Sequence, residues 1–375
     1  MNRATAAART AGLACAMLTL SIAPPAAATD RPQTGNVQEA LNALSKTTGV
    51  VGAIGEVYVD GKRVGQGSAG SRLLNGKGGQ IPADSRYRVG SQTKQMTATV
   101  LLQLVQEGKL GLDDKLSAVL PQVAQQDLVE RADEITVRQL IRHTSGIPDF
   151  FTSGLFDDFD FTTYHPPAEL VKATRGLPRT GAPGEKFSYS STNYVLLGMI
   201  IERVTGHPLS AEFTRRVFAP VGMNRTYLPT RPPAAIKGPH GHGYYPDPEG
   251  KLHDMDRLNA SYGYAAGGVI STARDVSAFQ RAFVQGKLLP ASLQKVITDP
   301  PEGAPPQPSP GGRLCGGEPA LQAIGGSGPG FMAATFTSPD GRLQLAVSAT
   351  LSVNNMDFSP AALDQTAKAV FCPGK

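Results

Sequence analysis

Two β-hairpin patterns, one near each end of the chain, restrict the possible folds more than any other feature of the sequence. Residues 50–66 hold two runs of strand-forming residues around an Asp-Gly pair, and residues 331–351 repeat this arrangement. Asp-Gly favours the left-handed backbone conformation of a tight antiparallel turn, so each pattern predicts a hairpin. Helices are predicted at residues 36–44 and 360–371, while the middle of the chain is mostly helix and loop.

Together these elements predict an α+β/α fold. We expect an antiparallel β-sheet built from both ends of the chain, flanked by N- and C-terminal helices, with a mostly helical inserted subdomain. The α/β part is expected over about residues 29–90 and 260–375, and the helical part over about residues 91–259. Hydrophobic residues make up 40% of the 375 residues and charged residues 18%, which excludes a disordered chain. The Pro- and Gly-rich stretch 300–312 is expected to be a surface loop.

The first 28 residues have the organisation of a signal peptide. Arg3 and Arg9 give a positive start, and residues 11–22 are mostly apolar. Residues 26–28 are alanines, which suit a signal peptidase. The alternative is a lone N-terminal membrane anchor, but the apolar run is short for a permanent span, and no other segment approaches 18 apolar residues. We therefore expect a secreted, extracellular protein with no stable membrane span after cleavage.

The charge balance argues against nucleic acid as a partner. The chain has 36 basic and 31 acidic residues, a net charge of +5, and removal of Arg3 and Arg9 would leave +3. No run of five or six basic residues is present to follow a phosphate backbone. Nucleic acid is therefore not an expected partner.

Export would leave two cysteines, Cys315 and Cys372, in an oxidising compartment. A disulfide between them would close a loop of about 57 residues and contribute about 4 kcal/mol on the chain-entropy model. The alternative is two unpaired buried thiols. We expect the bridge.

Several motifs that can indicate a cofactor or metal site lack the surrounding sequence features that such a site requires. Residues 65–70 fit the dinucleotide pattern G-x-G-x-x-G, but no helical pattern follows them. His240 and His242 could bind a metal, but their Gly/Pro-rich setting offers no third ligand at a suitable spacing. The nucleophile motif G-x-S-x-G is absent from the sequence. We therefore expect no cofactor and no metal.

One motif with chemistry remains, Ser91-Gln92-Thr93-Lys94 at the start of a strongly predicted helix. Residues three apart share a helix face, so Lys94 can reach the Ser91 hydroxyl. A serine at a helix N-terminus is placed where the helix dipole favours developing negative charge, and a buried lysine is a suitable base to activate it. The alternative is a helix cap followed by a surface lysine.

The surrounding sequence resembles the penicillin-recognising serine hydrolases of the class C type, which include D-alanyl-D-alanine carboxypeptidases, class C β-lactamases and related esterases. The resemblance covers about residues 36–372. It is carried, in the family's order, by residues 87–94 (YRVGSQTK), 101–110 (LLQLVQEGKL), 135–140 (ITVRQL), 143–146 (HTSG), 183–184 (PG), 187–190 (FSYS), Gly206 and 266–272 (AGGVIST). The family's β-lactamase/transpeptidase-like fold agrees with the fold predicted above, and two cysteines of the family match Cys315 and Cys372.

The resemblance implies acyl transfer through a serine. It implies that Ser91 is the nucleophile, Lys94 the lysine of the first motif and Tyr189 the tyrosine of the second, which moves protons between the nucleophile and the leaving group. The expected activity is that of a D-alanyl-D-alanine carboxypeptidase on peptidoglycan-type peptides, with β-lactams as inhibitors. Tyr189 taken alone would be interpreted as a half-buried aromatic residue.

The sequence departs from the family in the second motif. The asparagine of Y-x-N falls on Ser191, and Asn193 matches a separate family asparagine. Because serine is shorter and has no carboxamide, we expect its contact with a substrate amide to be weaker or mediated by water.

The third motif has lost its basic residue. A gapless match places this motif on Ile324-Gly325-Gly326, with the amide of Ser327 next to it. A gapped match would put Pro329, which has no N–H, where the family uses an oxyanion-hole donor. We therefore expect Ser91 and Ser327 to donate to the oxyanion, with Ser191 and Gly326 beside the substrate. Arg313 is a conceivable substitute for the missing cation, although it fits a solvated loop arginine better.

Three functions stay open at this point. The first is a carboxypeptidase that acts on small D-Ala-D-Ala peptides. The second is an esterase or amidase on the same scaffold, which the missing cation favours because a neutral ester needs none. The third is a catalytically weak binding protein, against which the joint presence of Ser91, Lys94 and Tyr189 argues. A true β-lactamase is less expected, because rapid deacylation needs a complete water-activating site.

Overall fold

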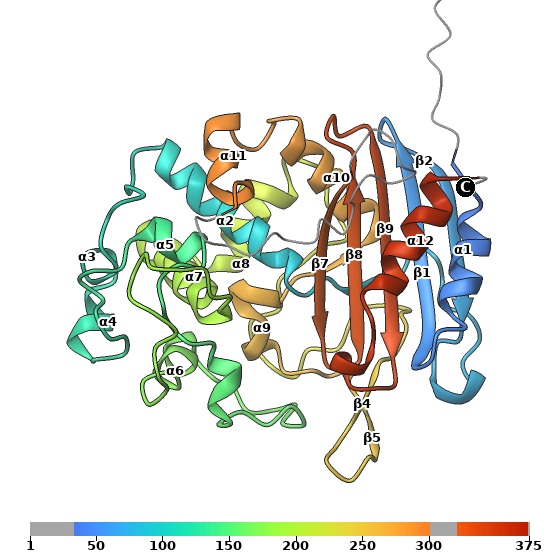
Figure 1. Cartoon of the computed structure of the whole chain (residues 1–375), viewed down its shortest axis with the longest axis horizontal. Coiled ribbons are helices and arrows are strands. Elements are labelled where there is room, and N and C mark those ends of the chain that lie inside the picture. Colours follow the sequence, from blue (N-terminus) through green and yellow to red (C-terminus); the bar gives the residue numbers. More distant parts are fainter. Residues whose placement is uncertain (1–33, 301–320, 374–375) are drawn as a thin grey trace, which may run out of the picture. The chain divides into compact units, whose positions relative to one another are not determined.

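A five-stranded antiparallel sheet joins the two ends of the described chain (Figure 1). The computed structural model describes residues 34–300 and 321–373. The strands, in spatial order, are β2 (Lys62–Gly70), β1 (Val50–Val59), β9 (Leu343–Leu351), β8 (Phe331–Thr337) and β7 (Gln322–Gly328). The central pairing of β1 with β9 confirms the predicted sheet built from both ends of the chain.

The N-terminal hairpin forms as predicted but is longer. Asp60 and Gly61 both have positive φ, 50° and 76°, as the tight turn requires. The second strand was expected over residues 63–66 and extends to Gly70, because its small residues keep pairing with β1. On the outer edge, the Gln38 side chain donates to Ser68 O (2.7 Å) and accepts from Ser68 N (3.1 Å). The glycines of residues 65–70 are thus part of a strand.

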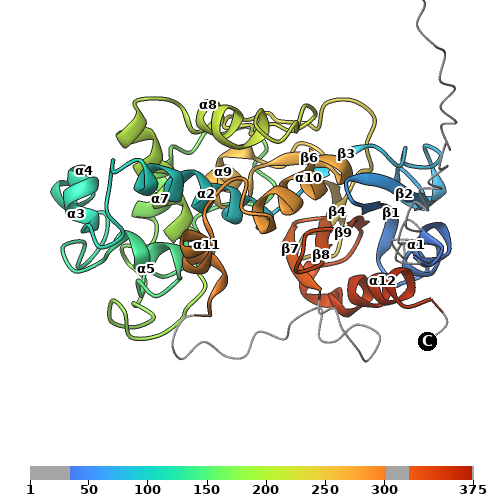
Figure 2. The same cartoon turned by 90° about the horizontal axis from the view of Figure 1, so that it is seen from above.

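Helices cover both faces of the sheet (Figure 2). On one face, α1 (Val37–Leu44) buries apolar side chains against β1 and β2, and α12 (Ala361–Phe371) buries them against β8. On the opposite face lies α10 (Ala273–Val284), whose Phe279 and Phe283 join the core of the helical part. The predicted terminal helices are therefore confirmed.

The helical part lies between β3 and β6 in the chain. Its two longest helices are α2 (Gln92–Gln106) and α7 (Ser191–Thr205). The shorter ones are α3 (Leu116–Val119), α4 (Pro121–Gln125), α5 (Val137–Ile141), α6 (Pro167–Lys172), α8 (Leu209–Phe213), α9 (Ala260–Gly267) and, beyond β6, α11 (Ala291–Thr298). Two small two-stranded sheets pair β3 (Arg86–Arg88) with β6 (Ile270–Thr272), and β4 (Tyr244–Pro246) with β5 (Leu252–Asp254). Single turns of 3₁₀ or π helix occur at Leu74–Gly76, Phe150–Ser153, Thr214–Phe218 and Asn355–Asp357.

Some expectations fall outside the described residues. They are the signal peptide at residues 1–28, the loop at 300–312 beyond its first residue, Arg313 and Cys315. Cys372 follows α12 and is buried, and its bridge to Cys315 stays a prediction. Among the helices of the described residues, none has the length and apolar character of a membrane span.

The packing of α1 against the sheet predicts a large effect of one substitution. Leu41 is fully buried in the core between α1 and the sheet. Leu41→Ala should therefore lower the free energy of unfolding by about 2–5 kcal/mol, measured by urea denaturation. Asn42→Ala, on the exposed face of the same helix, is the control and should change it by less than about 0.5 kcal/mol. Equal effects of the two substitutions would contradict this packing.

Candidate active site

Ser91 lies at the junction between β3 and α2, where the sheet part meets the helical part. The preceding residue, Gly90, has a positive φ of 56°, which turns the chain from the strand into the helix. The Ser91 side chain makes no capping hydrogen bond to the helix. Lys94 is only 7% exposed. The interpretation of this motif as a helix cap with a surface lysine is therefore wrong.

The structure brings the three predicted catalytic residues together. Ser91 Oγ lies 2.8 Å from the Tyr189 hydroxyl, and Lys94 Nζ donates to Ser91 Oγ at 3.2 Å. Lys94 Nζ also donates to the carbonyl of Ala266 at 2.8 Å and lies 4.9 Å from the centre of the Tyr189 ring. The serine hydroxyl is thus in contact with two groups that can exchange protons with it.

Neighbouring side chains fix the start of α2, and the sequence analysis gave them no role. Thr93 Oγ1 accepts from Val269 N at 3.1 Å, and Gln92 Oε1 accepts from Thr335 Oγ1 at 2.7 Å. The first contact ties the helix to the segment before β6, and the second ties it to β8. Gln92 and Thr93 are the two residues between Ser91 and Lys94 in the Ser-x-x-Lys motif. Only the fold shows that these two positions have partners of their own.

The ring of His143 packs against the ring of Tyr189. The two rings are stacked with their centres 4.6 Å apart, and His143 Nδ1 accepts from Ser190 N at 3.1 Å. Burial, together with the nearby Lys94 charge, lowers the pKa of His143 to about 3. This histidine therefore stays neutral at physiological pH and positions the tyrosine. The HTSG motif that contains His143 is recognisable in the sequence, but no sequence pattern indicates that the His143 ring stacks on Tyr189.

The second motif places Ser191 and Asn193 differently. Ser191 lines the cavity next to Ser91, and its amide donates to Asp149 Oδ2 at 2.9 Å. Asn193 is fully buried, and its Oδ1 accepts from Ser145 Oγ at 2.6 Å. Asn193 thus has a structural role and does not replace the missing asparagine at position 191.

The third motif runs along β7 directly beside Ser91. A methyl group on Gly326 would lie 2.1 Å from Val89 O and 2.6 Å from Ser91 N, so only glycine fits there. A methyl group on Gly90 would likewise lie 2.6 Å from Ser327 N. Pro329 instead occupies the turn between β7 and β8, beyond the paired residues. This arrangement favours the gapless match, with Gly326 against the Ser91 amide and Ser327 N beside Gly90.

A cavity of about 640 Å³, including its open mouth, extends from Ser91. Aromatic and small apolar residues form most of its wall, among them Phe151, Tyr262 and Phe331. Asp158 also lines the cavity, and burial, assisted by the neighbouring Asp157, raises its pKa.

Two cations line the cavity among the described residues, and both are engaged. Lys94 contacts Ser91 and Ala266. Arg88 Nη2 donates to the carbonyls of Ala234 (3.0 Å) and Asp256 (2.7 Å). Ile324 is not part of the cavity wall. In the described part of the chain, nothing replaces the carboxylate-binding base of the third motif.

A sheet with a helical insertion, and a Ser-x-x-Lys helix start facing a tyrosine, define the β-lactamase/transpeptidase-like class of serine hydrolases. The family model described as Beta-lactamase matches residues 37–368, so the chain belongs to the beta-lactamase family.

Relatives and solved structures agree with this membership. Penicillin-binding protein 4 of Amycolatopsis lactamdurans is 32% identical over 259 residues, which are 68% of this chain and 64% of that protein. The D-stereospecific amidohydrolase from Streptomyces sp. is 31% identical with a TM-score of 0.76, over 90% of this chain and 98% of that one. The D-amino acid amidase from Ochrobactrum anthropi SV3 in complex with L-phenylalanine amide is 25% identical with a TM-score of 0.73, over 89% and 96%.

The environment of His143 predicts a pH dependence of stability. The pKa of His143 is lowered in the folded state, so the unfolded chain binds the additional proton once the pH falls below about 6.5. Between pH 7 and pH 5 the native protein should lose about 1–2 kcal/mol of unfolding free energy through this residue.

The control is His143→Gln, which keeps an acceptor for Ser190 N but does not titrate. Urea denaturation of both proteins at pH 7 and pH 5 isolates the contribution of His143. Parallel pH dependence in the two proteins would show that His143 is not held neutral by the fold.

Proposed function

We propose that this chain is a serine hydrolase that forms an acyl-enzyme on Ser91 and cleaves short amides of D-amino acids. The observation that carries the proposal is the contact of Ser91 Oγ with both Lys94 Nζ and the Tyr189 hydroxyl. The backbone of β7 at Ser327 lies against the same turn. A nucleophile, a proton acceptor and backbone donors at one point are the parts that acyl transfer needs.

In the first step, Ser91 Oγ attacks the amide carbon while the Lys94–Tyr189 pair takes its proton. The negative oxygen of the tetrahedral intermediate is stabilised by the amides of Ser91 and Ser327. The C–N bond then breaks, and Tyr189 returns the proton to the leaving amine. In the second step, water gives its proton to the same pair and attacks the ester. The acid is released, and the proton returns to Ser91.

Charge in the cavity supports a substrate with a free amino group. Asp158 is an acid on the cavity wall and forms no salt bridge with another described residue, whereas Arg88 and Lys94 are already engaged. An ammonium group would find a counter-charge there, but a terminal carboxylate would not. The similarity to a D-stereospecific amidohydrolase and a D-amino acid amidase supports the same substrate class.

A D-alanyl-D-alanine carboxypeptidase is the second candidate. The 32% identity to penicillin-binding protein 4 favours it, and it predicts the same acyl-enzyme and inhibition by β-lactams. It would need a cation for the substrate carboxylate, which the described residues of the cavity do not offer. An esterase with the same fold would need neither a cation for a substrate carboxylate nor an acidic group for a substrate amine.

The proposal includes secretion of the protein and a disulfide between its two remaining cysteines. The signal-peptide pattern of residues 1–28 supports secretion, and secretion would allow Cys315 and Cys372 to form their bridge. An exported hydrolase would meet extracellular amides and peptides.

Acylation of Ser91 is tested with a fluorescent penicillin. The native protein should be labelled, and mass spectrometry should place the label on the peptide that contains Ser91. Ser91→Ala should abolish labelling and leave the fold intact, because a small polar change at a helix start costs only about 1 kcal/mol. Unchanged labelling of the variant would refute the assignment of the nucleophile.

The role of Asp158 is tested with Asp158→Asn. A charge-assisted hydrogen bond contributes about 1.5–3 kcal/mol, so kcat/KM for D-phenylalanine amide should fall about ten- to a hundredfold. The N-acetylated amide, which has no ammonium group, should be hydrolysed at the same rate by both proteins.

The matched control is Asp133→Asn, an exposed acid that does not line the cavity, which should keep native selectivity. If Asp158→Asn reduced the hydrolysis of both amides equally, the proposed recognition of the amine would be wrong, although the acyl-enzyme would still stand.

A further inference from the structure

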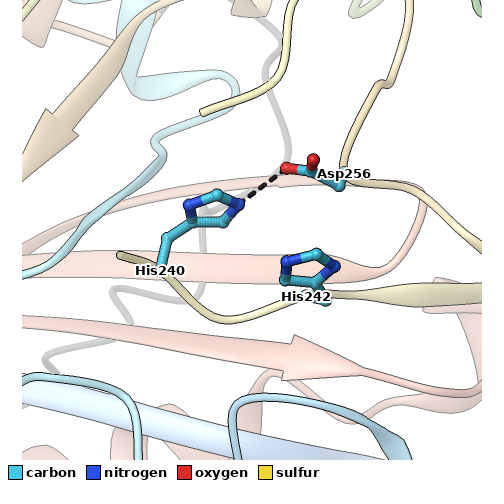
Figure 3. Close-up of side chains that lie close together, drawn as sticks. All are labelled: His240, His242 and Asp256. Atoms are coloured by element: carbon cyan, nitrogen blue, oxygen red, sulfur yellow. Dashed lines mark hydrogen bonds and ion pairs between the residues drawn. The ribbon is translucent and has the colours of Figure 1, made fainter. Parts of the chain in front are cut away.

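Two histidines and an aspartate lie together outside the active-site machinery. His240 and His242 precede β4, and Asp256 follows β5, so the β4–β5 hairpin brings them side by side (Figure 3). The two imidazole rings are parallel, with their centres 5.0 Å apart. The sequence spacing offered no third ligand to the histidines, but the fold supplies Asp256.

The hydrogen bonds of His240 show which of its nitrogens carries a proton. Nδ1 lies 2.6 Å from the carbonyl oxygen of Gly238, which can only accept, so Nδ1–H is the donor. In the neutral ring this leaves a lone pair on Nε2. That nitrogen lies 2.7 Å from Asp256 Oδ1. At this distance a proton lies between the two atoms in a hydrogen bond, and a metal ion could take its place once the atoms separate to about 3.3 Å.

His242 is oriented by a second carboxylate. Its Nδ1 lies 2.8 Å from Asp254 Oδ2, and a carboxylate can only accept, so Nε2 keeps its lone pair. A carboxylate that holds the far nitrogen of a histidine is the usual support of a metal-binding imidazole. Both histidines can therefore offer Nε2 to a metal ion, His242 directly and His240 when the ion displaces the proton between Nε2 and Asp256.

The cluster also has a suitable size. One ligand atom from each of the three residues can be chosen so that all lie within 4.8 Å of one another. Bonds of about 2.0–2.2 Å to a central zinc ion would place the ligand atoms about 3.3 Å apart, which small rotations of the side chains can achieve. The side chains of His242 and Asp256 are 21% and 19% exposed, so water can reach a fourth position.

We propose that His240 Nε2, His242 Nε2 and the Asp256 carboxylate form a binding site for a divalent transition-metal ion of the zinc type. Imidazole ligands favour zinc, cobalt, nickel and copper over magnesium and calcium. The site lies behind the cavity, because the carbonyl of Asp256 accepts from Arg88, three residues before Ser91. A bound ion would tie the segment before β4 to the segment after β5 and stabilise this wall of the cavity.

The test uses the full, tag-free chain after treatment with EDTA and dialysis. Isothermal titration with Zn²⁺ should show one equivalent bound with a Kd of about 10 μM or lower, and the melting temperature should rise with Zn²⁺ concentration. Co²⁺ should give visible absorption bands of a four- or five-coordinate ion. Because these readouts do not involve hydrolysis, they are independent of the proposed function.

Variants separate this site from adventitious binding. Asp256→Asn and His242→Ala should each weaken Zn²⁺ binding at least tenfold and abolish the Co²⁺ spectrum. Asp254→Asn removes the carboxylate that supports His242 but keeps an acceptor for the Asp256 amide, so it should have a smaller effect in the same direction. His207→Ala, an exposed histidine outside the cluster, is the control and should bind as the native protein does. Absence of stoichiometric binding, or binding unchanged in all cluster variants, would overturn the proposal.

Discussion

The close backbone contact between β7 and the turn before α2 is the constraint on which the site depends. Gly326 lies against Val89 and Ser91 with no room for a side chain, and Ser327 N lies equally close to Gly90. The turn belongs to the start of the helical part, whereas β7 is an edge strand of the sheet. The contact therefore exists only when the sheet, closed by β1 and β9 from opposite ends of the chain, is complete.

A buried lysine beside a serine needs an environment that holds both in place. Lys94 is held by the carbonyl of Ala266 and faces the ring of Tyr189, which in turn is stacked on the neutral His143. Each group is supplied by a different segment of the chain. Because their positions are fixed by packing, the serine needs no large rearrangement before it reacts, which is the advantage of a preorganised site.

The charges around the described part of the cavity support the proposed preference for an amine over a terminal carboxylate. The family's base in the third motif is replaced by Ile324, which does not reach the cavity wall, and Arg88 is occupied by two backbone carbonyls. Asp158 gives the cavity an acidic group instead. In a partly dry cavity such a difference in charge selects between substrates more strongly than shape alone, because water screens it less.

The sequence by itself determined the two hairpins, the terminal helices, the Ser91-x-x-Lys94 helix start and the choice of Tyr189. These features depend on residues close together in the chain, or on a motif that matches a family. The supporting roles of Gln92, Thr93 and His143, the acid at Asp158 and the meeting of Asp256 with two histidines were decided only by the tertiary structure. The contacts of Gln92, Thr93, His143 and Asp256 join residues between 14 and 243 positions apart, and periodicity in the sequence carries no information on contacts across such distances.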